Sequence, residues 1–517
     1  MSDTRAAPRW SVGSAALASR IDRSGAMRRK ALRARLSVLL ETLGQDVPSD
    51  LPTRGLLEAV EGALDVPEAS TVWLLISVLA GRLPDRAAVI SGLRLARLDG
   101  VLAVIERHLP RTRLGRLTAR GALPPLRVVT DTVLVDLHHT ADTTLATGIQ
   151  RVSRMAAQRW ARDHELVVVG WAPRWTGLIQ LDPMERKRAL HGTPAASRAA
   201  ADRTVLVPWR CTYLLPELLT EPERARALEG VVAFSRSRSG MIGHDCVPVS
   251  SAETTGEGMG GGFAAMLVAA ALMDRIAAVS DASRTEYTGW RTMLAGAGLS
   301  GPEIRAVPLA LEAEPASAGA LASARDQLGV AGLPMVLVVG SHEPRKNHLA
   351  VLHAMELLWR EGHSFSLLFV GGNAWRSERF TARLAELQSV GRPVETRSGL
   401  SDDLLWGAYA LAHIVLFPSL NEGFGLPVAE ALASGTPVVT SGYGSMAEVA
   451  RAGGALFVDP RDDDDIAAKV RRLLTDDTLY AELSEQARAR TTRTWDQYAE
   501  ETWQYFTAET HEPVVGR

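Results

Sequence analysis

Apolar positions follow a helical period in the first part of the chain. In residues 1–123, apolar residues recur every three or four positions, a spacing typical of amphipathic helices. Pro48, Pro52, Pro67 and Pro84 fall between these segments, where helix-breaking residues belong. The pattern predicts a small all-helical N-terminal domain over 1–123. Its expected helices span 27–43, 53–64, 70–80, 86–98 and 101–108.

Short apolar runs alternate with helical segments from residue 126 onward. Such alternation is typical of a parallel sheet that is covered by helices on both faces. The first set predicts a Rossmann-like domain over 124–312. Its expected strands span 132–136, 166–170, 204–207, 241–247 and 275–279.

A second set of the same kind follows a proline-containing linker and predicts another Rossmann-like domain over 313–517. Its expected strands span 335–339, 366–370, 394–397, 414–417, 437–440 and 455–458. Helices are expected at 464–474, 478–491 and 495–510. The chain is therefore expected to be an α/β protein with two doubly wound domains behind a helical one.

Charge and cysteine content exclude several classes of protein. The net charge of −2 over 517 residues argues against a nucleic-acid partner. Cys211 and Cys246 have no metal or redox spacing, which is typical of reduced thiols. The most apolar run, 263–273, is shorter than the roughly 18 residues that span a bilayer, and predicts a buried helix. Because the N-terminus also lacks the apolar core of a secretory signal, we expect a cytoplasmic protein.

Basic residues are distributed unevenly. The first forty residues contain nine basic and two acidic residues, interleaved with Ala and Leu. This pattern fits either peripheral contact with the inner face of the membrane or a solvated helix face, and we favour the solvated face. Only four of the 57 basic residues are lysines, which points to a GC-rich bacterial genome and makes Lys346 stand out.

The segment 418–440, PSLNEGFGLPVAEALASGTPVVT, carries the most specific pattern. Glu422 precedes Glu430 by eight residues, and a glycine-rich turn between them leads into a helix. Free N–H groups and the macrodipole at a helix start favour an anion. Pro427 suits the first helical position, where its missing N–H has no consequence. Anion donors flanked by two carboxylates suit a sugar esterified to a diphosphate.

This segment resembles the retaining GT-B glycosyltransferases of group 1, or family four, whose signature is two glutamates separated by seven residues. EGFGLPVAE matches the signature without a gap, and the resemblance, closest to mannosyltransferase-type members, covers about 132–510. It implies two Rossmann-like domains facing a cleft, with the last helix packed back on the first. It also implies that Glu422 orients sugar hydroxyls and that Glu430 lies near the ribose. The implied donor-binding residues here are Glu422, Gly423, Phe424, Gly425, Leu426 and Glu430.

A basic motif follows another buried strand. In the segment 336–349, VLVVGSHEPRKNHL, the strand ends at Gly340, and Arg345 and Lys346 precede a helix. Ligands of open α/β sheets bind beyond the carboxyl ends of the strands. Cations at a helix start oppose its dipole, so an anion between them is favoured. The segment resembles the R-K-N motif of the same family, which implies that Arg345 and Lys346 hold the departing diphosphate and that Gly340 contacts the donor.

Two segments of the first sheet domain resemble family motifs that face the cleft. SGMIGHDCVP places His244 and Asp245 near a strand end, where His244 is a candidate proton acceptor. The alternative is a structural histidine with Asp245 capping a turn. TGIQRV places Gly148 at a helix start, near the phosphates or the acceptor. Many members have two glycines there and this chain has Thr147 and Gly148, so a plain helix start is the alternative.

Gly371, Ser398 and Leu400 follow strands of the second sheet domain, and the resemblance implies that they lie near the nucleotide base. Glu448 is interpreted first as a helix-start residue and second as a ligand contact. The four acids at 462–465 open a helix and complement its dipole, so we assign no metal. No cofactor is expected, because the nucleotide diphosphate sugar is a substrate.

The predicted function is transfer of a hexose, with retention, to a hydroxyl of a glycan, a lipid-linked glycan or a small molecule. GDP-mannose is the favoured donor, with UDP- and dTDP-sugars open, and cell-surface polysaccharide or glycoconjugate biosynthesis is the expected setting. The same fold also serves pseudo-glycosyltransferases that couple a cyclitol, and sugar-phosphate synthases. An alternative of another class is a non-catalytic scaffold or adaptor that acts through the helical domain.

Overall fold

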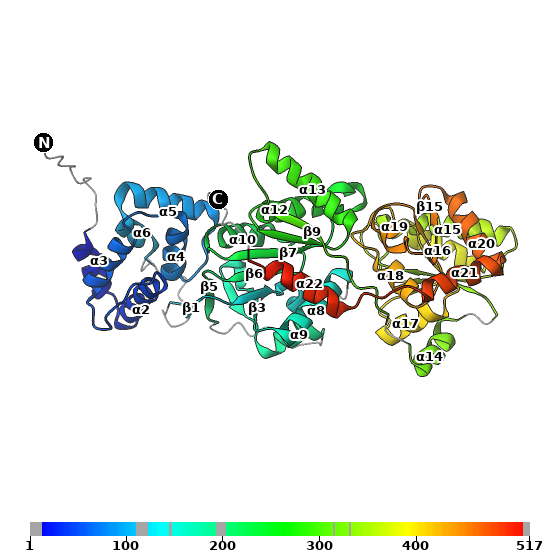
Figure 1. Ribbon diagram of the computed structural model, residues 1–517, viewed down its shortest axis with the longest axis horizontal. Coiled ribbons are helices and arrows are strands. Elements are labelled where there is room, and N and C mark those ends of the chain that lie inside the picture. The colour runs from blue at the N-terminus through cyan, green and yellow to red at the C-terminus, as the bar shows by residue number, and fades with distance from the viewer. Residues whose placement is uncertain are drawn as a thin grey trace.

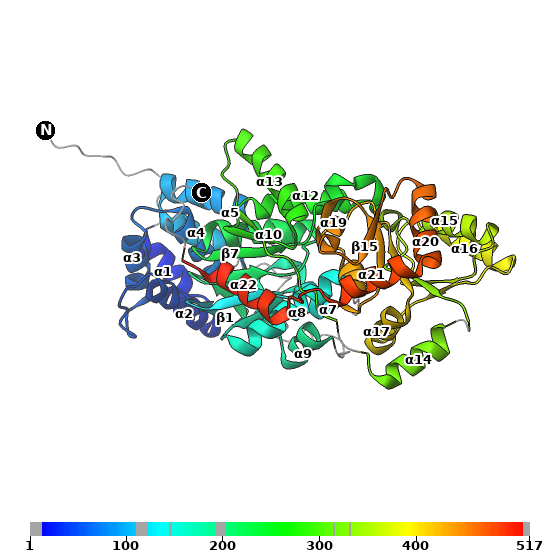
Figure 2. The same ribbon diagram turned by 45° about the vertical axis from the view of Figure 1, so that its right-hand side comes forward.

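The computed structural model describes residues 13–109, 123–143, 147–192, 203–313, 316–329 and 332–509. These residues form three parts along the longest axis of the molecule (Figure 1): a helical region (13–109), a first sheet domain (123–313) and a second sheet domain (316–509). Figure 2 shows that the last helix, drawn in red, returns from the second sheet domain to the first. Among the described residues, no helix has the length and apolar content needed to cross a membrane.

Six helices make up the described part of the helical region. They are α1 (Ser14–Asp22), α2 (Ala26–Thr42), α3 (Thr53–Ala63), α4 (Ala69–Ala80), α5 (Arg86–Asp99) and α6 (Val101–His108). The five predicted helices are confirmed to within one residue at either end. Asp85 caps α5 by accepting from Ala88 N at 2.8 Å, and Gly81 ends α4 with φ 63°. The unpredicted α1 buries only Leu17, Ala18 and Ile21, too few positions to show a helical period.

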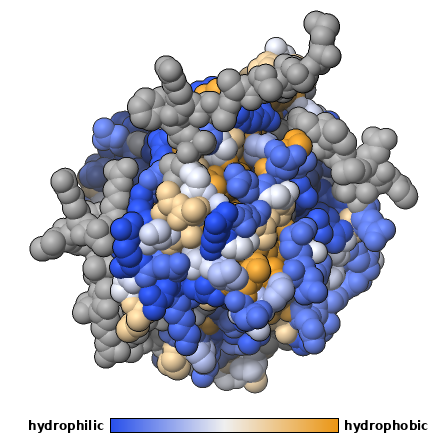
Figure 3. All heavy atoms as spheres, turned by 90° about the vertical axis from the view of Figure 1, so that its left-hand side faces the viewer, coloured by the Kyte–Doolittle hydropathy of each residue, from blue (hydrophilic) through white to orange (hydrophobic). Residues whose placement is uncertain are grey.

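The helical region shares its core with the first sheet domain. Trp73 of α4 belongs to the same buried apolar cluster as Val207 and Leu228 of that domain. Gly230 permits the close approach, since a Cβ there would lie 2.2 Å from the carbonyl oxygen of Pro84. The outward face of the helical region mixes hydrophilic and apolar residues (Figure 3). This region is therefore a fixed part of the molecule, and its removal would expose the shared core.

The first sheet has nine strands among the described residues, in the order β1-β5-β4-β3-β2-β6-β7-β8-β9. The strands are β1 (Leu126–Val129), β2 (Val133–Asp136), β3 (Val167–Trp171), β4 (Leu178–Gln180), β5 (Val205–Pro208), β6 (Thr212–Leu215), β7 (Arg238–Gly243), β8 (Arg275–Ala278) and β9 (Glu303–Ala306). The expectation of a purely parallel sheet is wrong, because β4 is antiparallel to β3 and β5. It forms a hairpin with β3, closed by Ala172 N donating to Gly177 O at 2.8 Å.

Four of the five predicted strands of this sheet match β2, β3, β5 and β8. The prediction of 241–247 is wrong, because β7 starts earlier and ends at Gly243, which leaves His244 and Asp245 in the following loop. The helices of this domain are α7 (His138–Asp142), α8 (Gly148–Asp163), α9 (Pro183–His191), α10 (Pro222–Phe234), α11 (Val247–Ser250), α12 (Met259–Ala270) and α13 (Asp281–Gly296). The expected buried helix, α12, buries one face only, since Val268 is 51% exposed.

The second sheet has six parallel strands in the order β12-β11-β10-β13-β14-β15. They are β10 (Met335–Val339), β11 (Ser366–Val370), β12 (Val394–Arg397), β13 (Ile414–Phe417), β14 (Val438–Ser441) and β15 (Ala455–Val458). All six predicted strands are confirmed to within one residue. The winding reverses between β10 and β13, which is where ligands bind in open α/β sheets.

Nine helices surround this sheet or follow it in the described residues. They are α14 (Ala318–Leu328), α15 (His348–Arg360), α16 (Glu378–Ser389), α17 (Asp402–Leu411), α18 (Leu426–Ala433), α19 (Gly444–Ala450), α20 (Asp463–Thr475), α21 (Asp477–Arg488) and α22 (Trp495–Thr507). The last helix, α22, packs on α8 of the first sheet domain, where Trp160 Nε1 donates to Ala499 O at 2.8 Å. Trp495 and Tyr498 of α22 are buried in this contact region.

Candidate active site

The basic motif lies at the winding reversal of the second sheet. After β10, the chain passes Gly340, which has φ 143°, and turns through η3 (Pro344–Lys346) into α15. The loop after β13 runs beside it, with Leu420 N donating to Arg345 O at 2.9 Å. Two loops that are far apart in sequence therefore face each other at the carboxyl ends of neighbouring strands.

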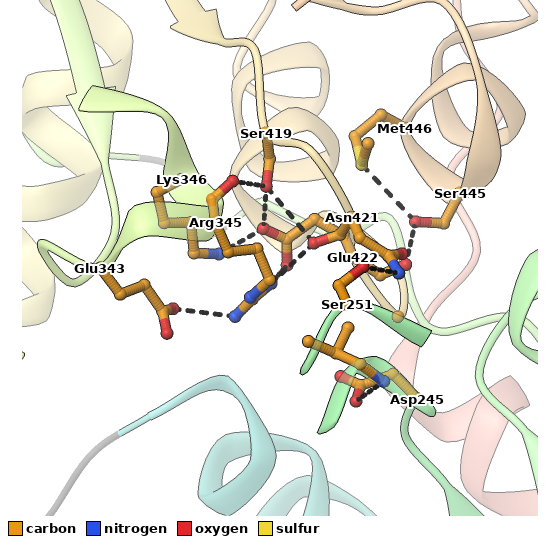
Figure 4. A network of polar contacts seen from close by, with 12 residues as sticks. Asp245, Ser251, Glu343, Arg345, Lys346, Ser419, Asn421, Glu422, Ser445 and Met446 are labelled. Atoms are coloured by element: carbon orange, nitrogen blue, oxygen red, sulfur yellow. Dashed lines mark hydrogen bonds and ion pairs between the residues drawn. The ribbon is translucent and has the colours of Figure 1, made fainter. Parts of the chain in front are cut away.

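Glu422 joins Arg345 and Lys346 in one buried cluster (Figure 4). Lys346 Nζ lies 2.6 Å from Glu422 Oε1, and Arg345 Nη1 lies 2.5 Å from Glu422 Oε2. The side chains of Arg345, Lys346 and Glu422 are 15%, 10% and 9% exposed. The Lys346 ammonium also lies 4.9 Å from the ring centre of Phe417. The structure thus brings together the three residues expected to handle the diphosphate and the sugar.

Charge pairing controls ionisation in this cluster. Burial alone would raise the pKa of Glu422, but Arg345 and Lys346 lower it to about 2. Burial also lowers the pKa of Lys346, against the attraction of Glu422. For Arg345, the nearby carboxylates outweigh burial and raise the pKa. Glu422 and Arg345 are therefore charged at neutral pH, and an incoming phosphate would compete with Glu422 for the cations.

Two residues of the cluster were not predicted. Glu343 Oε1 accepts from Arg345 Nη2 at 2.8 Å and from Ser341 Oγ at 3.1 Å. Its other oxygen, Oε2, is buried and has no hydrogen-bond partner among the described residues. Ser419 Oγ donates to Glu422 Oε1 at 2.7 Å. Glu343 stands two residues before Arg345 in the basic motif, so its position was a usable signal, whereas Ser419 had none.

Glu430 lies apart from this cluster, in α18. Its carboxylate accepts from the Tyr409 hydroxyl at 2.6 Å and pairs with Arg151 Nη1 at 2.5 Å. Burial raises the pKa of Glu430 against both partners. Arg151 belongs to α8, so this ion pair joins the two sheet domains. A ribose hydroxyl at Glu430 would share the carboxylate with these two side chains.

The turn after Glu422 aims the start of α18 toward the cluster. Gly425 has φ 95°, a left-handed conformation that glycine adopts without strain, and it stands at the N-cap of α18. Pro427 is the second residue of the helix, one position later than predicted but still in the first turn, where its missing N–H has no consequence. The local sequence therefore explains both the sharp turn and the helix start beside Glu422.

Other residues of this turn touch the first sheet domain. A Cβ on Gly423 would lie 2.1 Å from the carbonyl oxygen of His244, and a Cβ on Gly148 would lie 3.2 Å from Leu426 Cδ1. Phe424 is buried. Gly148 opens α8 after a capping box of Thr147 and Gln150, which is the plain helix start named above as the alternative. Gly423, Leu426 and Gly148, which were expected to contact the donor, lie where the two sheet domains meet.

The side chains of His244 and Asp245 have different partners. His244 Nε2 donates to the carbonyl of Pro216 at 2.9 Å, and burial lowers the pKa of its ring to about 4, so it is neutral at pH 7. Asp245 lies on the side of the cluster (Figure 4), with Oδ1 accepting from Val247 N at 3.1 Å as in a capped turn. Burial raises the pKa of Asp245 to about 6. Asp245 is thus the member of the pair that faces Glu422.

The residues expected near the nucleotide base, Gly371, Ser398 and Leu400, have different surroundings. Gly371 allows a close backbone approach, since a Cβ there would lie 1.9 Å from Gly340 O. Ser398 is exposed in the loop after β12. Leu400 is half-buried and packs against the core between the domains. They follow the neighbouring strands β11 and β12.

The helix-start interpretations of the acidic residues fit the structure. Glu448 accepts from Asp281 N at 3.0 Å and Ala282 N at 3.1 Å, so it caps α13 of the other sheet domain. Asp462 caps α20 through the N–H groups of Asp464 and Asp465. Within the part of the chain that the structure describes, no group of three or more His, Cys, Asp or Glu side chains could hold a metal ion.

Comparison with known proteins identifies the second sheet domain. Residues 323–490 match the family described as Glycosyl transferases group 1. The serotype-specific mannosyltransferase WbdA of Escherichia coli is 27% identical over 336 residues, which cover 62% of this chain and 40% of WbdA. The chain thus spans less than half the length of this curated relative. Residues 323–490 form a group 1 glycosyltransferase domain.

Solved structures share the arrangement of the two sheets. Sucrose-phosphate synthase from Thermosynechococcus elongatus aligns with a TM-score of 0.53 at 17% identity, covering 72% of this chain and 98% of that one. HepE of Anabaena, solved in complex with UDP and glucose, aligns with a TM-score of 0.53 at 15% identity, covering 73% and 100%. The two sheet domains have the GT-B fold, and the helical region precedes it.

Proposed function

We propose that this protein is a retaining glycosyltransferase that moves a hexose from a nucleotide diphosphate sugar to a hydroxyl group. The observation that carries the proposal is the buried cluster of Arg345, Lys346 and Glu422 at the winding reversal of the second sheet. It offers two cations to a diphosphate and, beside them, a carboxylate to sugar hydroxyls. The group 1 domain at residues 323–490 supports the proposal.

In the proposed reaction, the bond between the anomeric carbon and the diphosphate oxygen breaks, and its electron pair goes to that oxygen. Arg345 and Lys346 lie where this charge develops, so they stabilise the transition state more than the ground state. The sugar passes through an oxocarbenium-like state. The acceptor oxygen then bonds to the anomeric carbon on the face that the diphosphate leaves. Its proton passes to the departing diphosphate oxygen, so retention requires no protein base.

Glu422 orients the sugar in this mechanism. Beside Arg345 and Lys346 its pKa is about 2, so it is ionised when the donor arrives and can accept hydrogen bonds from hydroxyls. The donor phosphates replace it on Arg345 and Lys346, which frees it to turn toward the sugar. This differs from a glycosidase, in which two facing carboxylates perform the chemistry. The bond of His244 to Pro216 leaves Nδ1 as an acceptor, and the ring pKa of about 4 makes it a weak base, so we assign His244 to sugar contact instead of proton transfer.

For the donor we propose mannose carried by GDP. WbdA is a mannosyltransferase by its name, and the SGMIGHDCVP segment and the TGIQR loop resemble that group. HepE was solved with UDP, so the nucleotide is the first variable to test. By the same likeness we propose that the acceptor is a glycan, a lipid-linked glycan or a small molecule in cell-surface polysaccharide or glycoconjugate biosynthesis.

The test is binding and slow hydrolysis across GDP-, UDP- and dTDP-linked hexoses with no metal added. We expect one donor to raise the Tm selectively and to release free sugar over time. The matched variant Glu422→Gln should still be stabilised by that donor but release sugar about 100-fold more slowly. Failure of every donor to bind the folded wild-type protein would contradict the proposal and favour the scaffold alternative.

A further inference from the structure

The first sheet domain holds the second on both sides of Glu422. On one side, Asn421 Nδ2 donates to Ser250 Oγ at 3.1 Å and to Ser251 Oγ at 3.0 Å. Figure 4 shows Asn421 and Ser251 next to Glu422. The residue before Glu422 is therefore fixed by the end of α11 in the opposite domain.

On the other side, the carbonyl of Gly423 accepts from Ser280 Oγ at 2.6 Å and from Ser283 Oγ at 2.9 Å. Both serines lie at the start of α13, where the unpaired N–H groups and the dipole favour a negative partner. Glu448 of the second sheet domain accepts from the first N–H groups of the same helix. The start of α13 thus binds the loop that carries Glu422 through specific hydrogen bonds.

Position 423 requires glycine because of contact and not because of conformation. Gly423 is not among the positive-φ residues, so an alanine would fit the turn itself. A Cβ at this position would lie 2.1 Å from the His244 carbonyl oxygen and 3.0 Å from its carbonyl carbon. These are backbone atoms of the first sheet domain, which cannot swing aside as the end of a flexible side chain can.

We propose that this contact is a docking point through which the first sheet domain positions Glu422. The docking point consists of Gly423, the His244 carbonyl and the hydroxyls of Ser280 and Ser283. The inference rests on the proposed function, because it assigns these groups to the positioning of Glu422 in that site. Gly423 is bonded directly to Glu422, and misplacement of a reacting group by about 1 Å can lower a rate about 100-fold.

The diphosphate ligands are held by groups of the second sheet domain alone, Glu422 among them. Arg345 and Lys346 both come from the second sheet domain, and Asn347 fixes their loop by donating from Nδ2 to Pro418 O at 3.2 Å and Pro460 O at 2.6 Å. Loss of docking should therefore leave nucleotide binding in place and stop transfer. A merely structural role of Gly423 would change both together or neither.

The test is Gly423→Ala, with Gly289→Ala as the matched control. Gly289 lies in α13, has nothing within 4 Å of an added Cβ, and touches no part of the proposed site. We expect Gly423→Ala to lower donor turnover about 100-fold while the Kd of the nucleoside diphosphate stays within about threefold. Gly289→Ala should match the wild-type protein in both. Small-angle scattering should show a larger radius of gyration for Gly423→Ala than for Gly289→Ala.

The variant Ser283→Ala is a second test of the same contact. It removes the hydroxyl that donates to Gly423 O at 2.9 Å and to His244 O at 3.0 Å, and it leaves the N–H of Ser283 to the cap of α13. We expect turnover to fall about tenfold, because one buried donor shared by two carbonyls is lost, with nucleotide affinity unchanged.

Wild-type turnover in Gly423→Ala would overturn the docking point. So would a loss of nucleoside diphosphate binding in parallel with turnover, because Gly423 would then contact the nucleotide directly. If the wild-type protein binds and hydrolyses no donor, the proposed function fails. The scattering comparison still decides the docking itself: equal radii of the two variants overturn it, and a larger radius for Gly423→Ala supports it.

Discussion

The protein contains two buried charge clusters at the carboxyl ends of parallel strands, and they are built differently. In the first sheet domain, Arg224 Nη2 lies 3.0 Å from Asp136 Oδ1 and 2.7 Å from Glu217 Oε1, and all three side chains are at most 1% exposed. In the second, Arg345 and Lys346 share Glu422 and remain 15% and 10% exposed. In the first cluster a single cation, Arg224, is shared by carboxylates, whereas in the second two cations share Glu422 and Arg345 also pairs with Glu343.

The remaining partners explain the difference. Glu217 also accepts from His139 N and Thr140 N, both at 2.8 Å, and Asp136 accepts from Trp171 Nε1 at 2.6 Å. These donors belong to the fold and fix α7 to the sheet. Glu422 is held mainly by side chains, which an incoming anion can take over. Burial of charge alone does not mark a functional site, whereas an exchangeable partner does.

The largest expected effect is on protein stability, through the Arg224 cluster of the first sheet domain. Arg224→Met leaves two buried carboxylates without their cation, and should destabilise the protein by about 3–5 kcal/mol. Urea unfolding monitored by circular dichroism measures this change. Nucleotide binding per folded molecule should be unaltered. A change of less than about 1 kcal/mol would show that the two clusters do not differ as described.

Substitutions in the cluster of Arg345, Lys346 and Glu422 should change activity more than stability. Lys346→Met removes one of two cations from the departing diphosphate, so turnover should fall about 100- to 1000-fold. Arg345 stays on Glu422, so stability should change by only about 1 kcal/mol. Steady-state hydrolysis of the preferred donor and urea unfolding measure the two quantities. Near-normal turnover would remove Lys346 from the proposed role.

Stability should depend on pH in opposite ways through two carboxylates of the second sheet domain's cluster and its neighbour, Glu422 and Asp245. Glu422 has a lowered pKa of about 2, so its contribution is present above its unfolded pKa and is lost as pH falls toward 2. Asp245 has a raised pKa of about 6, so its contribution is present at low pH and is lost as pH rises from about 4 to about 6.

Asp245→Asn should therefore flatten the stability profile between pH 4 and pH 6. At pH 7 the variant should be about 2 kcal/mol more stable than the wild-type protein, because the penalty of ionising Asp245 is absent. Unfolding free energies measured from pH 4 to pH 8 test this prediction. An unchanged slope between pH 4 and pH 6 would show that Asp245 is ionised throughout.

The smallest expected effect lies at the ion pair between the domains. Arg151 is 28% exposed and pairs with Glu430, so its contribution should be about 1 kcal/mol. Arg151→Gln should lower turnover about three- to tenfold and leave nucleoside diphosphate affinity unchanged. A loss as large as that of Lys346→Met would move the centre of the site from the Glu422 cluster to Glu430.

The strands of the second sheet domain could be predicted almost completely from the sequence. Each of β10, β11 and β13 is buried at every position and apolar except for Ser366 of β11, which gives an unambiguous signal. In the first sheet domain, β4 is three residues long and β9 carries exposed Glu303 with no buried position, so neither shows such a run. The antiparallel hairpin of β4 depends on pairing that no local pattern encodes.

In the candidate site, too, some residues could be predicted from the sequence and others could not. Arg345, Lys346 and Glu422 stand in short motifs whose spacing places them at strand ends, and the structure brings them together. Arg151 lies 279 residues before Glu430, so only the packing of the two domains reveals that pair. The resemblance implied that Gly423 binds the donor, and the structure places the backbone of the other sheet domain beside it.

The most direct test of the central claim is the affinity for a nucleoside diphosphate relative to the matching monophosphate, measured without metal in wild-type protein and Lys346→Met. If Arg345 and Lys346 form the diphosphate site, the wild-type protein should bind the diphosphate at least about tenfold more tightly, a difference of about 1.4 kcal/mol. Lys346→Met should remove most of that difference and leave monophosphate affinity unchanged. An equal ratio in the two proteins would contradict the account.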